Sequence, residues 1–120
     1  MISYRTFVKS LTYAINGLVN VFRHENSFRI QVLVAVIVLT AAVILPLEAW
    51  QIILLILMAA AVMILEILNT IFERLSDVLK PRLHPLVKEI KDMMAGAVLL
   101  TSVTATIVGV LIFLSFFEVI

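Results

Sequence analysis

The chain is short of the residues that build several common kinds of site. It has 120 residues, no cysteine and three glycines, which are Gly17, Gly96 and Gly109. Without cysteine there is no disulfide framework and no thiol chemistry. Three widely separated glycines also exclude the glycine-rich phosphate loops of P-loop proteins and soluble kinases. The sequence therefore carries no local nucleotide signature.

Charge is scarce as well, because charged residues make up 14% of the chain and hydrophobic residues 63%. The mean hydropathy is +1.19. A soluble domain of this size would expose much of that apolar surface to water, so the composition indicates an integral membrane protein. We expect an all-α membrane fold in a single domain over 1–120. Its expected spans are three apolar runs within 29–46, 49–79 and 93–117.

The residues before the first span predict a different kind of helix, over 3–22. Its apolar residues recur at helical spacing, and polar and basic residues cover the rest of its surface. The apolar series is Phe7, Leu11, Ile15, Leu18 and Phe22. We interpret this segment as an amphipathic helix lying in the membrane interface. Turns are expected at 23–27, 46–49 and 80–85, and a short helix over 86–92 leads into the third span.

The distribution of positive charge predicts the topology. All nine Lys and Arg residues lie within 5–29 or 74–91, and the connection at 46–49 has none. By the positive-inside rule, the N-terminus and the 74–92 segment are cytoplasmic and the C-terminus is outside.

The second span carries a polar stripe where it leaves its apolar run. Glu66, Asn69, Glu73 and Asp77 fall on one face of a helix. Ionisable groups at membrane depth cost roughly 2.5 kcal/mol or more each, so a functional role is the default hypothesis. Glu66 lies about two turns deeper than Glu73.

The predicted topology gathers further reactive residues at the cytoplasmic interface. Acidic groups from separate segments suit Mg²⁺, which prefers oxygen ligands, and lysines suit phosphate. A deeper carboxylate could accept a proton from a lipid hydroxyl. Together these groups suggest phosphoryl transfer to a lipid. The residues concerned are Glu25, Glu73, Asp77, Lys91 and Asp92, with Glu66 as the deeper group.

Other interpretations of the same residues stay open at this point. Glu73 and Asp77 are also compatible with a solvated helix end that pairs with Arg74 or Lys80. Glu66 is equally compatible with the exchange carboxylate of a small proton-coupled transporter. A third alternative is a non-catalytic subunit of a membrane assembly.

A resemblance to a known family favours the first interpretation. The pattern Glu66-x-x-Asn69-Thr70-x-x-Glu73-x-x-x-Asp77 is followed by His84, Lys91-Asp92 and Ala95-Gly96-Ala97. It resembles the signature of the small prokaryotic diacylglycerol kinases, a family that includes undecaprenol kinases. The upstream segments Phe7 to Gly17 and Glu25 to Arg29 resemble the family in order and spacing, so the resemblance covers about residues 5–117.

The resemblance implies an ATP- and Mg²⁺-dependent lipid kinase of the bacterial inner membrane. It would be a homotrimer whose active sites are shared between subunits, with a membrane lipid alcohol as the acceptor and no nucleic acid partner. Glu66 would be the general base that contacts this lipid, and Asn69 would orient groups near the γ-phosphate. Glu25 and Glu73 would hold Mg²⁺ on the nucleotide. The other residues expected at the nucleotide are Tyr13, Arg82, His84, Lys91 and Asp92.

The sequence departs from the family pattern at two places. The family often has a basic residue where Thr6 stands, and we expect Lys9 or Arg5 to supply that substrate contact. Gln31 occupies a position that is acidic or His in many members, so no role transfers to it. The segment Asn26 to Ile30 is closer to the Gram-positive type, in which undecaprenol is the usual acceptor.

Overall fold

The computed structural model describes residues 3–79 and 84–117 and is helical almost throughout. Its four helices are α1 (Tyr4–His24), α2 (Asn26–Ile44), α3 (Ala49–Leu79) and α4 (His84–Phe116). The expected all-α fold with three apolar helices long enough to cross a membrane is confirmed. The interfacial position of the first helix and the homotrimer stay predictions.

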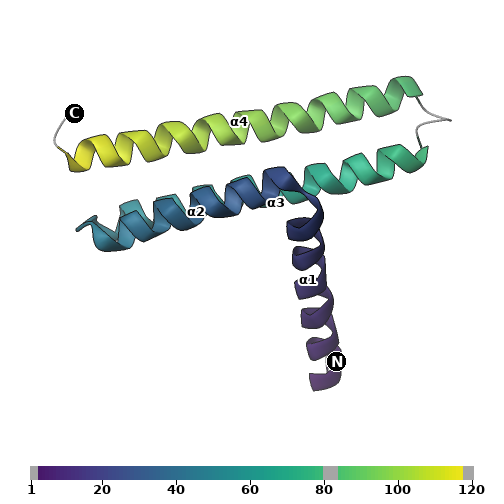
Figure 1. The fold of residues 1–120 in the computed structure, drawn as a ribbon, viewed down its shortest axis with the longest axis horizontal. Helices are drawn as coiled ribbons and strands as arrows, with labels where there is room; N and C mark the ends of the chain where they lie inside the picture. The colour runs from purple at the N-terminus through teal and green to yellow at the C-terminus, as the bar shows by residue number, and fades with distance from the viewer. Residues whose placement is uncertain (1–2, 80–83, 118–120) are drawn as a thin grey trace.

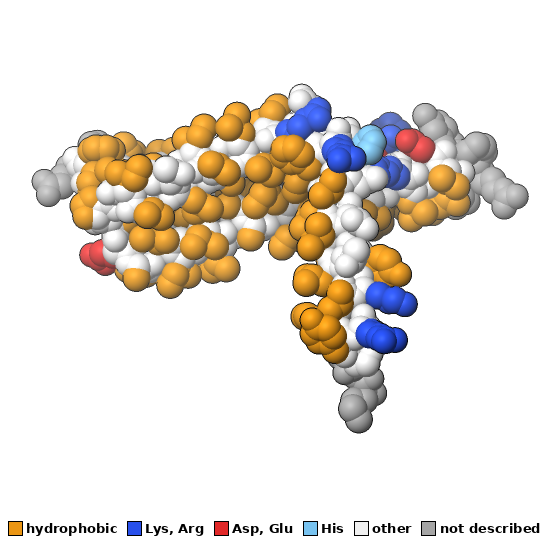
Figure 2. All heavy atoms as spheres, turned by 60° about the horizontal axis from the view of Figure 1, so that its bottom comes forward, with side chains coloured by type: hydrophobic (Ala, Val, Ile, Leu, Met, Phe, Trp, Pro, Cys, Tyr) orange, Lys and Arg blue, Asp and Glu red, His pale blue; other side chains and the backbone are white. Residues whose placement is uncertain are grey.

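Helix α1 stands apart from the other three helices. Its start is capped by Ser3, whose hydroxyl accepts a hydrogen bond from the Thr6 backbone N–H at 3.1 Å. In Figure 1, α1 points away from α2, α3 and α4, which run alongside one another. Figure 2 shows hydrophobic side chains along one side of α1 and Lys and Arg side chains along the other.

The turn expected over 23–27 is wrong in extent. Arg23 and His24 belong to the last turn of α1, and α2 already starts at Asn26. Within 23–27, only Glu25 has extended backbone, at φ −116° and ψ 110°. The chain therefore changes direction at a single residue, and that residue is one of the predicted site carboxylates.

The connection between α2 and α3 is short and ordered by side chains. Leu45 and Pro46 end the first apolar run, and Glu48 precedes the first turn of α3. The Gln51 side-chain oxygen accepts from the Glu48 backbone N–H at 2.9 Å, and Trp50 Nε1 donates to the Glu48 carboxylate at 2.6 Å. The first bond satisfies a backbone N–H at the start of α3, and the second joins two side chains across the connection.

Helix α3 is the centre of the fold, because it packs against both α2 and α4. Ala42, Leu55 and Ile112 form its buried contact with them near the α2–α3 connection. At 1.5 Å per residue the 31 residues of α3 span about 46 Å, which exceeds a hydrocarbon core of about 30 Å. The polar end of α3 therefore projects beyond the apolar layer. Its bounds are those expected for the second span.

Helix α4 is longer than the third span expected from the sequence. The segment 86–92 was expected to be helical and to lead into the span at 93–117, and the structure has one continuous helix that starts two residues earlier, at His84. Pro85 lies in its first turn, where proline costs no hydrogen bond. Within one copy of the chain, only 6% of the most apolar 18-residue stretch of α4 is buried.

Candidate functional site

Glu66 lies buried between helices, with 7% of its surface exposed. Its partner comes from the first apolar helix, since Gln31 Nε2 donates to Glu66 Oε2 at 3.3 Å. A carboxylate removed from water needs such a donor, because an unpaired buried charge is very unfavourable. The contact joins α2 to α3 across 35 positions of sequence. The carboxylate predicted as the general base thus has a defined setting inside the bundle.

Thr70, one turn after Glu66 on α3, is the most deeply buried polar side chain at 2% exposure. Within the part of the chain that the structure describes, its hydroxyl has no hydrogen-bond partner, and the same holds for Gln31 Oε1. Buried polar atoms without partners are uncommon in folded proteins. The Thr70 hydroxyl and Gln31 Oε1 are two such atoms, and both can still form a hydrogen bond with a ligand near Glu66.

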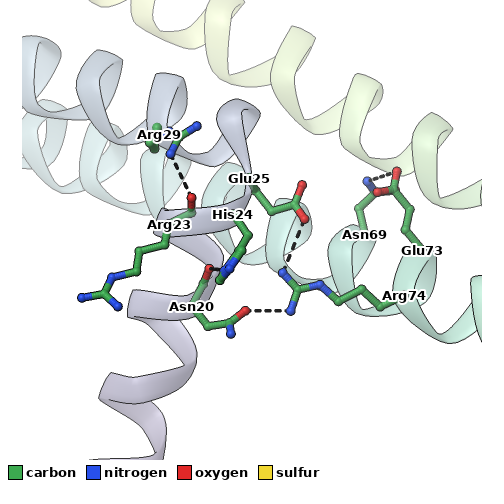
Figure 3. A network of polar contacts seen from close by, with 8 residues as sticks. All are labelled: Asn20, Arg23, His24, Glu25, Arg29, Asn69, Glu73 and Arg74. Carbon is green, nitrogen blue, oxygen red and sulfur yellow. Dashed lines mark hydrogen bonds and ion pairs between the residues drawn. The ribbon is translucent and has the colours of Figure 1, made fainter.

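Glu25 takes part in a contact between α1, α3 and the junction before α2. Arg74 Nη2 lies 3.5 Å from Glu25 Oε1, and Arg74 Nη1 donates to Asn20 Oδ1 at 2.7 Å. The His24 ring shares a hydrogen bond with the Asn20 carbonyl at 2.8 Å, and Arg29 donates to the Arg23 carbonyl at 3.0 Å. Figure 3 shows Arg74 reaching across to both partners. Arg74 therefore ties α1 to the polar end of α3.

Glu73 has a partner on its own helix. Asn69 Nδ2 donates to Glu73 Oε1 at 3.1 Å, one turn apart on α3. In Figure 3 the Glu73 side chain turns toward Asn69, whereas its neighbour Arg74 extends toward Asn20 and Glu25. The idea that Glu73 or Asp77 pairs with Arg74 is therefore wrong, because Arg74 reaches α1 and Glu25 instead. Glu73 is exposed, in contrast to Glu66.

The predicted nucleotide residues of α4 lie in its first turns. Asp92 accepts from Lys88 Nζ at 2.8 Å, with both side chains mostly exposed. Lys91 is half-buried on the same helix. Surface pairs of this i, i+4 kind contribute little to stability and exchange readily with other partners. Lys91 and Asp92 are therefore available to a ligand that approaches this end of α4.

The remaining predicted site residues lie further out. Tyr13 and Lys9 are exposed on α1, with Tyr13 at 69%. His84 is the first residue of α4. Arg82 falls outside the described residues. Within a single copy, the structure does not bring Tyr13 or Lys9 into contact with Glu66.

The described side chains do not form a ready-made metal centre. Among them, no group of three His, Asp or Glu residues is placed so that it could hold a metal ion. Glu25 and Glu73 nevertheless come from segments joined by Arg74, whose side chain bonds Glu25 and whose backbone adjoins Glu73. Two carboxylates of this kind are what Mg²⁺ commonly takes from a protein when substrate phosphates supply other ligands.

An apolar groove of about 670 Å³ runs between α2, α3 and α4. Gln31, the partner of Glu66, lies at one end of it on α2, and Phe117, the residue after the end of α4, lies at the other. Most side chains between them are aliphatic, such as Val38, Leu55 and Val110. Gln31 connects the groove to the buried carboxylate, because its side chain lines the groove and donates to Glu66. An apolar lining of this kind suits an aliphatic chain.

Three residues of the site were not assigned from the sequence. Gln31, Thr70 and Arg74 each owe their place to contacts between helices. A weak signal existed for Gln31, because it is one of two polar residues in an apolar run of sixteen and such a residue usually needs a partner. Nothing in the sequence pattern identifies Glu66 as that partner.

Comparison with known proteins adds a different kind of information. The sequence model described as "Prokaryotic diacylglycerol kinase" matches residues 12–113. The chain belongs to this family. The match includes α2 and α3 in full and nearly all of α4, so Gln31, Glu66 and Thr70 lie inside it.

Relatives within the prokaryotic diacylglycerol kinase family carry two names. A diacylglycerol kinase of Synechocystis sp. is 44% identical over 83% of this chain, and the chain spans 58% of the length of that relative. An undecaprenol kinase of Bacillus subtilis is 34% identical over 90% of this chain and 88% of its own length. A diacylglycerol kinase of Pseudomonas aeruginosa is 34% identical, with 78% of each chain covered.

Proposed function

We propose that the protein is an ATP- and Mg²⁺-dependent lipid kinase that phosphorylates the hydroxyl of a membrane lipid alcohol at the cytoplasmic interface. The observation that carries this proposal is the buried Glu66 carboxylate, whose partner Gln31 lines an apolar groove, in a chain of the prokaryotic diacylglycerol kinase family. Family membership also argues against the transporter and assembly-subunit alternatives.

The groove gives the lipid a place beside the base. An aliphatic chain in the groove would leave its polar end near Gln31 and Glu66. In the reaction the lipid oxygen forms a bond to the γ-phosphorus, the bond from that phosphorus to the β–γ bridging oxygen breaks, and Glu66 takes the hydroxyl proton. General base catalysis of this kind contributes about 10²- to 10⁴-fold.

The nucleotide would lie at the exposed polar end of α3. Glu25 and Glu73 would hold Mg²⁺, with Asn69 beside Glu73 orienting groups near the γ-phosphate. When bound, Mg²⁺ offsets the negative charge of the phosphate oxygens. Lys91 and Asp92 on α4, and Tyr13, Lys9, Arg82 and His84 elsewhere, complete the set that the family resemblance assigns to substrates.

The arrangement fits a site at the membrane surface. Glu66 lies in the apolar part of α3 and Glu73 about two turns further along, at the end of the molecule where Lys and Arg gather (Figure 2). The N-terminus would then be cytoplasmic and the C-terminus outside. On α1, Phe7, Leu11 and Ile15 are each at least half exposed, which supports a position of this helix in the interface.

Assembly into a homotrimer is part of the proposal. The apolar surfaces of the three long helices are largely open in one copy, and α4 is the most open of them. Tyr13 and Lys9 lie away from Glu66 within one chain, and a neighbouring subunit would bring such residues to a shared site. Cross-linking or mass measurement in a mild detergent tests the number of subunits.

The proposed function is tested with purified protein, Mg²⁺, ATP labelled at the γ-phosphate, and either diacylglycerol or undecaprenol. We expect label in one or both lipids, and the ratio of the two rates identifies the acceptor. Omission of Mg²⁺ should abolish the transfer. If well-folded protein labels neither lipid, the proposed function is wrong, and proton-linked flux without ATP would favour a transporter.

A further inference from the structure

The side-chain amide of Gln31 has an orientation that its partner determines. An ionised carboxylate only accepts hydrogen bonds, so the NH₂ group of Gln31 must face Glu66, as it does at 3.3 Å. The carbonyl oxygen of the same amide then faces away. Among the described residues this buried oxygen has no partner. Among the described residues, the Gln31 amide therefore forms a hydrogen bond through its NH₂ group and none through its oxygen.

Thr70, one turn after Glu66 on α3, shows the same unused hydrogen-bonding capacity. A threonine inside a helix commonly donates to the carbonyl four residues back. Thr12, Thr101, Thr104 and Thr106 all do so here, at 2.8–2.9 Å. Thr70 does not form this bond within the described part of the chain, although it is more deeply buried than any of them. Its hydroxyl is thus kept free at the Glu66 face of α3.

A second glutamine, Gln51, shows what a purely structural role looks like in this fold. Gln51 is 8% exposed and lies at the opposite end of α3. Its side-chain oxygen accepts a backbone hydrogen bond three residues away, from Glu48 at 2.9 Å. Gln51 thus satisfies a local helix end, whereas Gln31 binds a carboxylate on another helix and retains an unused oxygen.

We propose that Gln31 is a positioning residue for Glu66 and that Gln31, Glu66 and Thr70 form a subsite for the hydroxyl end of the lipid acceptor. This inference rests on the proposed function. The N–H of Gln31 holds Oε2 of Glu66, which leaves Oε1 to take the hydroxyl proton. The Thr70 hydroxyl donates to the oxygen of the same lipid hydroxyl and so turns its hydrogen toward Glu66. The free Gln31 oxygen gains a donor when polar groups or water enter with the lipid.

The subsite distinguishes a hydroxyl from other lipid groups. An ester carbonyl only accepts hydrogen bonds, so it has no proton to give to Glu66 or to the Gln31 oxygen. A hydroxyl both donates and accepts. The three side chains therefore select a lipid alcohol by chemistry that diacylglycerol and undecaprenol share, and the groove determines which hydrocarbon part fits.

The test compares Gln31→Met with Gln51→Met, because each replaces a partly or fully buried glutamine of α2 or α3 by an apolar side chain of similar length. We expect kcat for lipid phosphorylation to fall about 100-fold in Q31M, since a misplaced catalytic group costs rates of this order. The KM for ATP should stay unchanged, and Gln31→His, which keeps an N–H donor, should restore part of kcat. Q51M should keep the kcat of the wild-type enzyme. In Thr70→Val we expect mainly a higher KM for the lipid.

The outcomes separate this inference from the proposed function. If the wild-type protein phosphorylates neither lipid, the proposed function fails. If the wild type is active and Q31M matches Q51M in kcat, or if Q31H restores nothing, the positioning role of Gln31 is wrong. If T70V leaves the lipid KM unchanged, the hydroxyl subsite is wrong. Should Q31M fail to fold, Gln31→Asn replaces it, because its shorter amide is unable to reach Glu66 and must give the same loss of kcat.

Discussion

Glu66 and Glu73 lie seven residues apart on α3 and occupy opposite environments. Glu66 is buried, and its partner is an amide from another helix, Gln31. Glu73 is exposed, and its partner is an amide from its own helix, Asn69. Both carboxylates receive one N–H donor, so the difference between them is access: one faces the interior of an apolar bundle, and the other faces the polar end.

The surroundings extend this contrast. Glu66 is bound by the neutral side chain of Gln31, and this contact depends on how α2 packs against α3. Around Glu25 and Glu73 the neighbours include Arg74, in a pair at 3.5 Å with side chains 48% and 28% exposed. A long, exposed ion pair rearranges at little cost. The buried region is therefore suited to fixed positioning of a base, and the exposed region to binding and release of a charged ligand.

Removal of the buried carboxylate should have the largest effect. In Glu66→Gln we expect the rate of lipid phosphorylation to fall about 10²- to 10⁴-fold, the usual contribution of a general base. The substitution keeps the size of the side chain, so the helical content should match that of the wild type. Labelled phosphate in extracted lipid measures the rate. A variant with more than a tenth of the wild-type rate would contradict the role of Glu66.

Changes at the exposed carboxylates should act on the nucleotide instead. In Glu73→Gln or Glu25→Gln we expect a higher Mg²⁺ concentration for half-maximal activity, because each variant loses a charged oxygen ligand. The KM for the lipid should stay the same. Asp77→Asn is the matched control, since Asp77 is exposed on the same helix and has no assigned role. Equal effects of all three substitutions would indicate a general charge effect.

Arg74→Met should have a smaller effect, through the position of α1. The variant loses the contacts to Asn20 and Glu25, and exposed pairs of this kind contribute up to about 1 kcal/mol. We expect faster proteolysis within α1 and a modest rise in the KM for ATP. Arg23→Met removes the same charge, and only the backbone carbonyl of Arg23 takes part in the network, so this variant should resemble the wild type. Equal proteolysis of the two variants would exclude Arg74 as the anchor of α1.

The smallest change is expected at the start of α4. Lys88→Met breaks the pair with Asp92, in which both side chains are mostly exposed. Such a pair contributes almost nothing to stability, so the midpoint temperature of unfolding should not change. Thermal unfolding followed by circular dichroism measures it. A clear drop would mean that Lys88 and Asp92 hold the end of α4 in place.

The sequence predicted the features that depend on local pattern. The bounds of α3 follow from the two breaks in the sequence pattern, at Pro46 and at Pro81, and the stripe at Glu66, Asn69 and Glu73 follows from helical periodicity. The one-residue junction at Glu25 was missed, because Asn26 and Ser27 favour turns and also start helices.

The partners within the site were not predictable in the same way. Gln31 and Glu66 meet because α2 packs against α3 in one rotation, which periodicity within a single helix does not determine. Arg74 has acidic neighbours in sequence, yet its side chain reaches α1, because the change of direction at Glu25 places Asn20 near it. Helix rotation and chain direction are properties of the tertiary fold.

The two carboxylates are assigned different roles, and the most direct test of this division is a binding measurement. A non-hydrolysable ATP analogue is titrated, in the presence of Mg²⁺, into the Glu66→Gln and Glu73→Gln variants, both shown to be equally folded. We expect Glu66→Gln to bind the analogue like the wild type while failing to phosphorylate lipid, and Glu73→Gln to bind it more weakly. Equal loss of analogue binding in both variants would contradict the assignment of Glu66 to the lipid and of Glu73 to the nucleotide.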